Sequence, residues 1–501
     1  MNTLRSMVQR ARTPRGRRAL VVTAGVLVLV FGVYRALRLD VFPALTSDSM
    51  SYMDRSLQYR SPGRIAHSRT VVMGHKYAGY PIFIAMCRGV GALVGSDPLT
   101  TIVVVQRLLF VAAIAMSVRL LGLFAAPLVY MLSAPSVVCF SNFVLTEGVT
   151  IPCAVLYACS LLLIERSGDG PAGRRRVAAT VLLSSCAAVS LLFMVMCKLP
   201  NAVFALPWVV VVVRARVRAG AGGGAPAQRT VWPAVAMSMT GVVLLAFVLH
   251  ASMINKREFG RFFPTVNTGR ILYWGAHYSV FTLRPANRQR ADLQVELADG
   301  SSYPRLYEVA RQHTGLDASE TLRDEARALL RKAGISYPLE ALRSAGFAMI
   351  GGERQELKAW LGGLLEHDGS DGYMGRPPKL QQMGERAWLE TYNDGRTPGG
   401  VPGLARGPMA PGHEFGAQRW LSVVLLAAVA ALVAVRREGF TALAMCISVA
   451  LFCAVVGHML VDIWRYLLNA WMVLAVAGCW AGRELAVRQF DVRVTSDGAQ
   501  E

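Results

Sequence analysis

The sequence predicts an all-α polytopic membrane protein, a bundle of about ten transmembrane helices with a mainly helical extracytoplasmic insert. The 501 residues are 53% hydrophobic and only 17% charged, and their mean hydropathy is +0.39. Uncharged runs such as ALVVTAGVLVLVFGV and WVVVVV recur along the chain, and about 20 apolar residues in a helix span a bilayer. The net charge of +21 is concentrated near the ends of these runs, where basic residues set the topology of membrane proteins.

The first span is predicted to be an uncleaved anchor. Residues 1–18 hold six arginines and no acid, and an apolar run over 19–33 follows them. This pattern also resembles a signal peptide. No convincing small-residue cleavage site follows the run, and many spans come after it. We therefore expect a cytoplasmic N-terminus.

Ten apolar stretches are predicted to cross the membrane. Alternating them across the bilayer puts the arginine-rich connectors and the C-terminal tail in the cytoplasm, as the positive-inside rule requires. The same alternation puts the loop after the first span, Glu147, Lys198 and residues 251–418 on the extracytoplasmic side. The stretches lie near 19–33, 99–118, 120–141, 147–164, 177–197, 199–213, 231–250, 420–435, 439–457 and 466–482.

The segment 79–95, GYPIFIAMCRGVGALVG, is apolar but is not counted as a span. It contains Arg88 and several glycines, and counting it would place the arginine-rich connectors outside. Backbone that is re-entrant or interfacial is tolerated where it lines a cavity. We therefore expect 79–95 to be a re-entrant or interfacial helix of the first outer loop.

The chain divides into three parts. Residues 1–250 form an N-terminal transmembrane module whose first outer loop covers 40–98, and 419–501 hold the last helices and a cytoplasmic tail. Between them, 251–418 form an extracytoplasmic insert with 21 basic and 19 acidic residues. A capping box at Asp317–Glu320 predicts a helix through Lys332 that Gly334 ends. Further helices are predicted from Pro338 and over Glu353–His367, and residues 395–416 form a connector rich in glycine and proline.

The basic balance does not imply a nucleic acid partner, because the excess charge lies at span ends. The nine cysteines lie in or beside apolar segments and form no CxxC pair. They are expected to be small core residues. No His/Cys spacing suits zinc, so we expect neither a metal nor another cofactor.

Asp48 is the first candidate for chemistry, because it follows the first span directly in the motif Asp-Ser-Met-Ser-Tyr. A carboxylate at a membrane surface can act as a general base on a hydroxyl group. Asp48 can equally be the N-cap of a helix over Ser49–Tyr59, and one residue can do both. The same loop carries a high density of charge, which is costly at a membrane unless it meets water or a charged ligand. Its candidate pocket residues are Tyr52, Arg64, Arg69, His75 and Lys76.

Three further candidates lie in other outer segments. Glu147 begins the fourth span, where a carboxylate is stabilised by the helix dipole or faces the same cavity as Asp48. Lys198 precedes the sixth span, and Arg465 with Tyr466 begins the last. Lys198 and Arg465 both lie on the predicted extracytoplasmic side, which usually carries fewer basic residues. They either extend to the interface beside a tryptophan or bind the phosphate of a lipid.

The order of these motifs resembles the GT-C superfamily of membrane glycosyltransferases. Within it, the chain is similar to bacterial polyprenyl-phosphate-sugar enzymes, relatives of the lipid A aminoarabinose transferases and protein O-mannosyltransferases. The similarity covers 19–213 and 460–482, with weaker support in 251–350. Ser49 follows Asp48 where the O-mannosyltransferases have a second acid, which argues against that subgroup. The matching motifs are Asp48–Tyr52, Gly79-Tyr80-Pro81, Leu145-Thr146-Glu147, Lys198-Leu199-Pro200, Gly269–Tyr273 and Trp464–Leu467.

The resemblance implies a sugar donor on undecaprenyl phosphate and a glycan, lipid or protein acceptor on the outer face of a bacterial inner membrane. Asp48 would take the acceptor proton during in-line attack with inversion. Arg465, Lys198 and Tyr466 would bind the donor phosphate, and Glu147 would shape the pocket. A phosphate leaving group needs no general acid, so one carboxylate suffices where a glycosidase needs two.

Two other classes of function remain open, namely a transporter or flippase and a non-catalytic assembly component. A ligase related to the glycosyltransferases is a further alternative. A transporter or lipid flippase is compatible with ten spans, and Arg107 is its main candidate inside an apolar run. Such proteins commonly show repeat symmetry and mid-span ionisable residues, and neither stands out here. A non-catalytic component of envelope-polymer assembly should tolerate loss of Asp48. A ligase that uses a lipid-diphosphate donor would share the arginine-rich outer loops.

Overall fold

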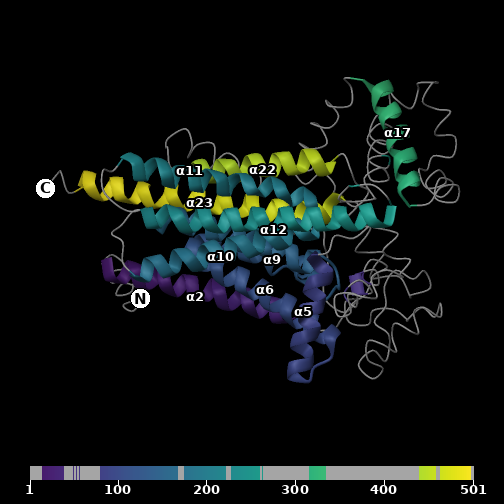
Figure 1. Ribbon diagram of the computed structural model, residues 1–501. Coiled ribbons are helices and arrows are strands. Elements are labelled where there is room, and N and C mark those ends of the chain that lie inside the picture. The colour runs from purple at the N-terminus through teal and green to yellow at the C-terminus, as the bar shows by residue number, and fades with distance from the viewer. Residues whose placement is uncertain are drawn as a thin grey trace.

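The structure is a computed structural model, and every element in the part that it describes is a helix. It describes residues 14–38, 49, 52–53, 56, 79–167, 174–221, 227–259, 262, 273, 315–334, 439–457 and 463–497. The long helices lie side by side as a bundle (Figure 1). They are α2 (Pro14–Arg38), α6 (Pro98–Leu121), α9 (Glu147–Ser167), α10 (Arg174–Cys197), α11 (Ala205–Ala221), α12 (Ala227–Phe259), α22 (Phe440–Gly457) and α23 (Ile463–Asp497).

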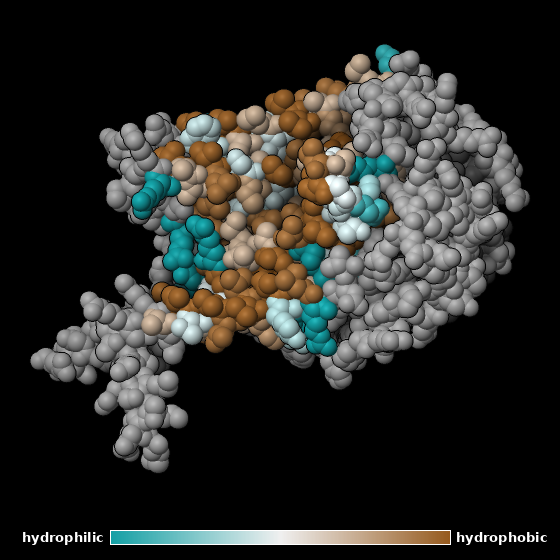
Figure 2. Space-filling view, turned by 90° about the horizontal axis from the view of Figure 1, so that it is seen from below, coloured by the Kyte–Doolittle hydropathy of each residue, from teal (hydrophilic) through white to brown (hydrophobic). Residues whose placement is uncertain are grey.

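The chain is a multi-pass membrane protein. Seven helical stretches of the described residues are long and apolar enough to cross a membrane, and Phe440–Cys453 is a shorter one. The predicted span over 420–435 lies outside the described residues. On the face shown in Figure 2, hydrophobic residues cover the middle and hydrophilic residues gather toward the two ends. This is the distribution that a protein surrounded by lipid requires.

Among the candidate membrane spans of the described residues, α9 is the most deeply buried and α12 the least. The apolar stretch of α9 is 94% buried inside the protein, whereas that of α12 is only 11% buried. A helix that is apolar all round and buried belongs to the interior. The exposed apolar side chains of α12, such as Met239, Val242 and Leu245, are those that lipid tails would cover. α9 is therefore the central helix, and its first residue is Glu147.

The prediction of one continuous span over 120–141 is wrong, because this segment is a series of short helices. The segment returns along α6, so that the two form a helical hairpin. Gly122 ends α6 with a φ of 59°, a conformation that glycine adopts at no steric cost. Pro127 and Pro135 lie near the starts of the next short helices, where proline is tolerated because no backbone donor is needed there. The pieces are η2 (Gly122–Ala125), α7 (Ala126–Leu132), α8 (Pro135–Val138) and η3 (Cys139–Ser141).

The broken segment runs back along α6. Gly32 of α2 lies against both Ile114 of α6 and Val129 of α7. Further along, the Gln106 amide nitrogen donates to the Phe143 carbonyl oxygen over 3.0 Å. Residues that come later in the return segment thus contact earlier residues of α6. This reversal carries the chain back across the bundle, so that α9 starts at the end where α6 starts.

Substituting Gly32 with alanine tests this hairpin. A Cβ at this position would overlap Val129 Cγ1 and lie 3.1 Å from Ile114 Cγ2, so we expect a loss of about 1–3 kcal/mol from overpacking. Gly25→Ala is the matched control on the same helix, because its Cβ would meet only Val118 Cγ1 at 3.8 Å. The measurement is the thermal unfolding temperature in detergent. Equal midpoints for the two variants would contradict the hairpin contact.

Arg107 has a structural explanation in the described contacts. Its side chain is buried in α6, and Nη1 donates to the Ala36 carbonyl oxygen near the end of α2. Nε donates to Ser141 Oγ over 2.6 Å, and Nη2 donates to Asn142 Oδ1 over 2.7 Å. Arg107 thus joins α2, α6 and the end of the return segment. These bonds provide the partners that a charge buried in a membrane protein needs.

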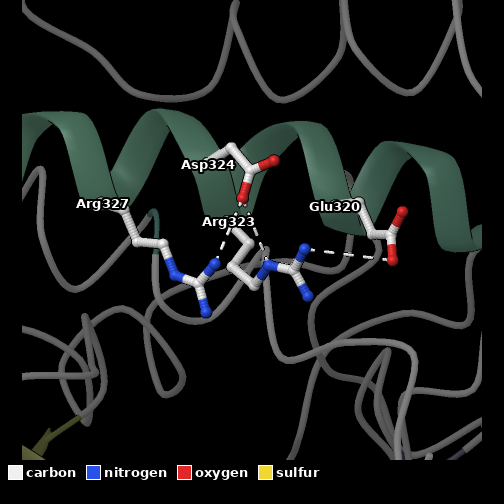
Figure 3. A network of polar contacts seen from close by, with 4 residues as sticks. All are labelled: Glu320, Arg323, Asp324 and Arg327. Carbon is white, nitrogen blue, oxygen red and sulfur yellow. Dashed lines mark hydrogen bonds and ion pairs between the residues drawn. The ribbon is translucent and has the colours of Figure 1, made fainter.

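The predicted helix of the insert exists as α17 (Gly315–Ala333), which stands apart from the bundle in Figure 1. It begins two residues before the predicted cap Asp317, and it ends as predicted at Gly334, which has a φ of 58°. Figure 3 shows a charged network on this helix, where Arg323 contacts Glu320 and Asp324, and Arg327 contacts Asp324. The helices predicted from Pro338 and over Glu353–His367 lie outside the described residues.

The cysteine prediction is confirmed. Of the eight cysteines whose side chains are described, seven are buried and Cys186 is half-buried, and all eight are free thiols. They come from α5 (Gly79–Val94), α9, α10, α22 and α23. They therefore contribute to the packing of the apolar core.

Candidate active site

Glu147 and Lys198 form a buried ion pair where α9 begins and α10 ends. The Lys198 ammonium nitrogen lies 2.7 Å from Glu147 Oε1, and the exposed fractions of the two side chains are 6% and 2%. The Thr146 hydroxyl donates to Glu147 Oε2 over 3.1 Å. Each charge would be costly to bury alone, and the pair removes most of that cost. The helix dipoles also contribute, because the carboxylate lies at the N-terminus of α9 and the cation at the C-terminus of α10.

The local chain explains why Lys198 points to α9. The Lys198 amide still donates to the Met194 carbonyl oxygen, as in a helix, but its own φ of −151° and ψ of 107° are extended. Leu199 then begins the short helix η4 (Leu199–Phe204), and Pro200 lies in its first turn, where proline is tolerated. Asn201 then closes the turn, since its side-chain nitrogen donates to Met194 O over 2.8 Å. The break between α10 and η4 thus turns the Lys198 side chain inward.

The loop between α2 and α5 contacts the segment before α9. Ser49, which follows Asp48 in the sequence, is fully buried, and its hydroxyl donates to the Val144 carbonyl oxygen over 2.9 Å. The Tyr52 ring lies edge-on against the Tyr80 ring, with centroids 5.1 Å apart. Tyr52 is also buried. The start of the first loop therefore lies at the same end of the bundle as the Glu147–Lys198 pair.

α5 completes this end of the bundle. Figure 1 shows it at the end away from the start of α2 and the end of α23, steeply inclined to the long helices. Gly79 at its start lies against the end of α10, where a Cβ would be 2.7 Å from the Cys197 amide nitrogen. The Tyr80 hydroxyl donates to Gln106 Oε1 over 2.8 Å. Burial raises the pKa of Tyr80 well above its ordinary value, so this phenol remains a donor.

The opposite end of the bundle holds other ion pairs, formed by arginines of α11 and α23. Glu165 in the last turn of α9 pairs with Arg214 of α11, whose guanidinium lies over the Phe440 ring, 5.5 Å from its centroid. Arg483 of α23 pairs with its neighbour Glu484 over 2.7 Å. The arginine-rich connectors adjoin this end, since α9 ends there and α10 begins there. The charges at the Glu147 end thus belong to a separate site.

Three of the predicted site residues are described with their side chains, namely Tyr52, Glu147 and Lys198, and the structure brings them to one end of the bundle. Tyr80 relates two of them, because its ring packs edge-on against Tyr52 and its hydroxyl bonds to Gln106, against which Gly148, the neighbour of Glu147, is packed. Arg465 and Tyr466 lie in the first turn of α23, and their side chains are outside the description. The other predicted residues also lie outside it: Asp48, Arg64, Arg69, His75 and Lys76.

Gln106 and Tyr80 are site residues that sequence reasoning did not single out. Tyr80 was noted only as part of the Gly-Tyr-Pro motif. Gln106 directly precedes Arg107 inside the apolar run of α6, and an amide is expensive at such a depth unless it is hydrogen-bonded. That polar pair was the available signal. Within the described ranges, no group of three or more His, Cys, Asp or Glu side chains could hold a metal ion.

Comparisons with known proteins add one weak similarity. No protein-family model matches the chain, and no curated protein matches it significantly. Among solved structures, the apo crystal structure of ArnT from Cupriavidus metallidurans is similar with a TM-score of 0.31 and 13% sequence identity. The match covers 93% of this chain and 77% of the ArnT chain. Values this low do not establish a shared family.

Proposed function

We propose that the protein is an integral membrane glycosyltransferase of the GT-C type. It transfers a sugar from a polyprenyl-phosphate donor to a glycan, lipid or protein acceptor of the cell envelope. The bundle end that holds Glu147 and Lys198 faces the extracytoplasmic side, and the arginine-rich connectors face the cytoplasm, in accord with the positive-inside rule. The order of the motifs along the sequence supports this class of enzyme.

The buried Glu147–Lys198 pair is the observation that most supports the proposal. The two residues are 51 positions apart in sequence, yet they meet at 2.7 Å with almost no exposure. Buried ion pairs contribute little net stability compared with apolar residues of similar volume. Ionisable residues within membrane segments are commonly functional. The pair lies at the end of the bundle where Ser49 and Tyr52 of the first outer loop are packed, Tyr52 against Tyr80. A transferase site at the membrane surface needs such a loop next to buried charges.

The proposed reaction is a single displacement. An acceptor hydroxyl oxygen attacks the anomeric carbon of the donor sugar, and the bond from that carbon to the phosphate oxygen breaks. Asp48 takes the hydroxyl proton, and the lipid phosphate leaves with the bonding electron pair. Attack in line with the leaving group inverts the configuration at the anomeric carbon. The barrier falls most where fixed cations meet the charge that develops on the phosphate.

Lys198 and Arg465 provide those cations in the proposal, and Tyr466 contributes a hydroxyl donor. An ammonium has three N–H donors, and Glu147 accepts one from Lys198. Glu147 thereby holds the ammonium in one orientation and also brings the net charge of the pair close to zero. We therefore assign the larger part of phosphate binding to Arg465, whose planar fork suits two phosphate oxygens. Tyr52, Arg64, Arg69, His75 and Lys76 are assigned to the walls of the donor and acceptor pocket.

Release of free undecaprenyl phosphate tests the function. The full-length protein is reconstituted in liposomes with a panel of undecaprenyl-phosphate sugars and extracts of envelope glycans and lipids, and mass spectrometry follows both products. We expect undecaprenyl phosphate and a glycosylated acceptor to appear together. Uptake of a solute or movement of the intact donor lipid between leaflets, with no covalent product, would instead support the transporter or flippase reading.

Arg465 variants test the binding geometry at the phosphate. We expect Arg465→Ala to raise the apparent KM for the donor more than Arg465→Lys does, because lysine keeps the charge but lacks the two-pronged geometry. Loss of a charge-assisted hydrogen bond corresponds to about 1.5–3 kcal/mol, or roughly tenfold to a hundredfold in KM. Donor titrations in proteoliposomes measure this. An identical KM for the two variants would count against the paired contact.

A further inference from the structure

Gln106 has all its hydrogen-bonding groups engaged inside the bundle. It lies on α6 and is fully buried. Its Oε1 accepts from the Tyr80 hydroxyl over 2.8 Å. Its Nε2 donates both to the Ser141 carbonyl oxygen over 2.9 Å and to the Phe143 carbonyl oxygen over 3.0 Å. A side-chain amide has two N–H donors, so both are used, and the orientation of the amide is fixed.

The first turn of α9 packs directly on this amide. A Cβ on Gly148 would overlap the Gln106 side chain, with Cδ only 2.6 Å away and Nε2 2.8 Å away. Only glycine leaves room for this approach of helix backbone to amide. Gly148 follows Glu147 in sequence, so a movement of the Gln106 side chain would displace the start of α9. The same displacement would reach the carboxylate that holds Lys198.

The other contacts of Gln106 lead to the first outer loop. Tyr80, which donates to Gln106, packs edge-on against Tyr52 of that loop. The turn over residues 141–143, which Gln106 holds by two carbonyl oxygens, continues to Val144, and Val144 accepts the hydroxyl of Ser49. The amide therefore joins the start of α5, the turn before α9 and the start of α9 itself. Two of these three elements contact the loop that carries Asp48.

We propose that Gln106 is a positioning residue that fixes the first outer loop relative to the Glu147–Lys198 pair. This inference rests on the proposed function, in which the loop supplies the base and the pair adjoins the donor phosphate. Gln106 acts through Tyr80, Gly148 and the turn over 141–143. Its loss should therefore misalign base and donor without removing a group that binds the donor. Turnover is predicted to fall while donor affinity persists.

Gln106→Met is the first variant, because methionine keeps the approximate volume and removes all three hydrogen bonds. We expect kcat to fall by about tenfold or more, since a displacement near 1 Å can cost a factor of about 100 in rate. The Kd for undecaprenyl phosphate, measured on the full-length protein by native mass spectrometry, should stay within about twofold of the wild-type value. Equal losses in kcat and in phosphate affinity would show a general structural defect and would overturn the proposal.

Gln106→Glu supplies a readout that a merely structural role would not move. A carboxylate can accept from Tyr80 but places negative oxygen against the Ser141 and Phe143 carbonyl oxygens, whereas a protonated carboxyl can donate to one of them. Its kcat relative to wild type should therefore rise as the pH falls. The same ratio for Gln106→Met should be flat across the same pH range. A flat profile for Gln106→Glu would contradict the assigned bonds.

Hydrogen exchange separates failure of this inference from failure of the proposed function, because it needs no transfer activity. In Gln106→Met, peptides covering residues 141–148 should exchange faster than in wild type, while peptides of the opposite end of α9 should be unchanged. Gly148→Ala adds a Cβ that overlaps the Gln106 amide and pushes it away from α9. This variant should therefore show the same faster exchange over residues 141–148. Ser117→Ala is the matched control, because Ser117 is buried on the same helix but donates to its own helix at Ala113 O.

The outcomes are distinct. Faster exchange over 141–148 without transfer activity in the wild-type protein would leave the positioning role standing and remove the proposed function. Unchanged exchange in both Gln106→Met and Gly148→Ala would overturn the positioning role whatever the activity. Should Gln106→Met fail to fold, Gly148→Ala carries the same test, since it alters the position of the amide and keeps all its polar groups.

Discussion

Replacing Lys198 with methionine is expected to destabilise the protein and to abolish transfer. The substitution leaves the carboxylate of Glu147 in a site where its side chain is only 2% exposed, without the cation 2.7 Å away. Removing one partner of a buried pair costs about 3–5 kcal/mol, because the other charge remains buried. This is a large fraction of the stability of an ordinary protein domain. The measurements are the thermal unfolding midpoint in detergent and sugar transfer in proteoliposomes.

The double variant Glu147→Gln/Lys198→Met separates stability from function. It removes both charges at once, so no unpaired charge remains and the unfolding midpoint should return close to that of the wild-type protein. Buried ion pairs can often be replaced by neutral residues with little loss of stability. Transfer should stay absent, because no cation is left at this position to meet the phosphate. Together with the wild-type protein and the two single variants, Glu147→Gln and Lys198→Met, it completes a double-mutant cycle, which gives the coupling energy of the pair.

Two outcomes would weigh against this account of the pair. A double variant that recovers transfer as well as stability would make the pair structural. A Lys198→Met variant with a wild-type unfolding midpoint would mean that Glu147 does not depend on Lys198. Arg214→Met serves as a reference, because Arg214 pairs with Glu165 at the opposite end of α9 and should affect stability without a specific effect on the donor KM.

Replacing Asp48 with asparagine is expected to lower kcat by a factor of about 100 to 10,000, the range for loss of a general base. Asparagine keeps the shape of the side chain and can still cap a helix at this position. Protein yield and donor KM should therefore change little. The assay follows the transfer of labelled sugar from undecaprenyl phosphate by the purified variant in proteoliposomes.

The matched control for Asp48 is Asp54→Asn, which removes a carboxylate from the same loop. We expect this variant to retain most of the activity. Wild-type turnover by Asp48→Asn would remove Asp48 as the base. Equal losses in both variants would point to the overall charge of the loop, and a different base would then have to be sought.

Much of the bundle could be predicted from the sequence, because apolar length and charged ends are strong local signals in a membrane protein. α9 begins at Glu147 as expected, and Gly334 ends α17. The prediction of one helix over 120–141 was wrong because hydropathy counts apolar residues and does not register where backbone breaks. Gly122, Pro127 and Pro135 were present in the sequence, yet their effect depends on what the neighbouring helices permit.

The interior of the candidate site was harder to predict. Glu147 and Lys198 were singled out separately, one for the helix dipole and one for its side of the membrane. No pattern in one sequence relates two residues 51 positions apart, so their pairing was not foreseen. Gln106 was missed for a similar reason, since its partners come from the start of α5 and the turn before α9. Such contacts depend on how helices are arranged in space, which periodicity does not encode.

The most direct test of the central claim is to map where the lipid phosphate binds. Full-length protein in liposomes is irradiated with an undecaprenyl-phosphate analogue that carries a diazirine beside the phosphate, and the attached peptides are identified by mass spectrometry. We predict attachment to the peptides that contain Glu147, Lys198 and the start of α23, with competition by unlabelled undecaprenyl phosphate. Attachment confined to the lipid-exposed side chains of α12, or to the end of the bundle around Arg214, would contradict the proposed site.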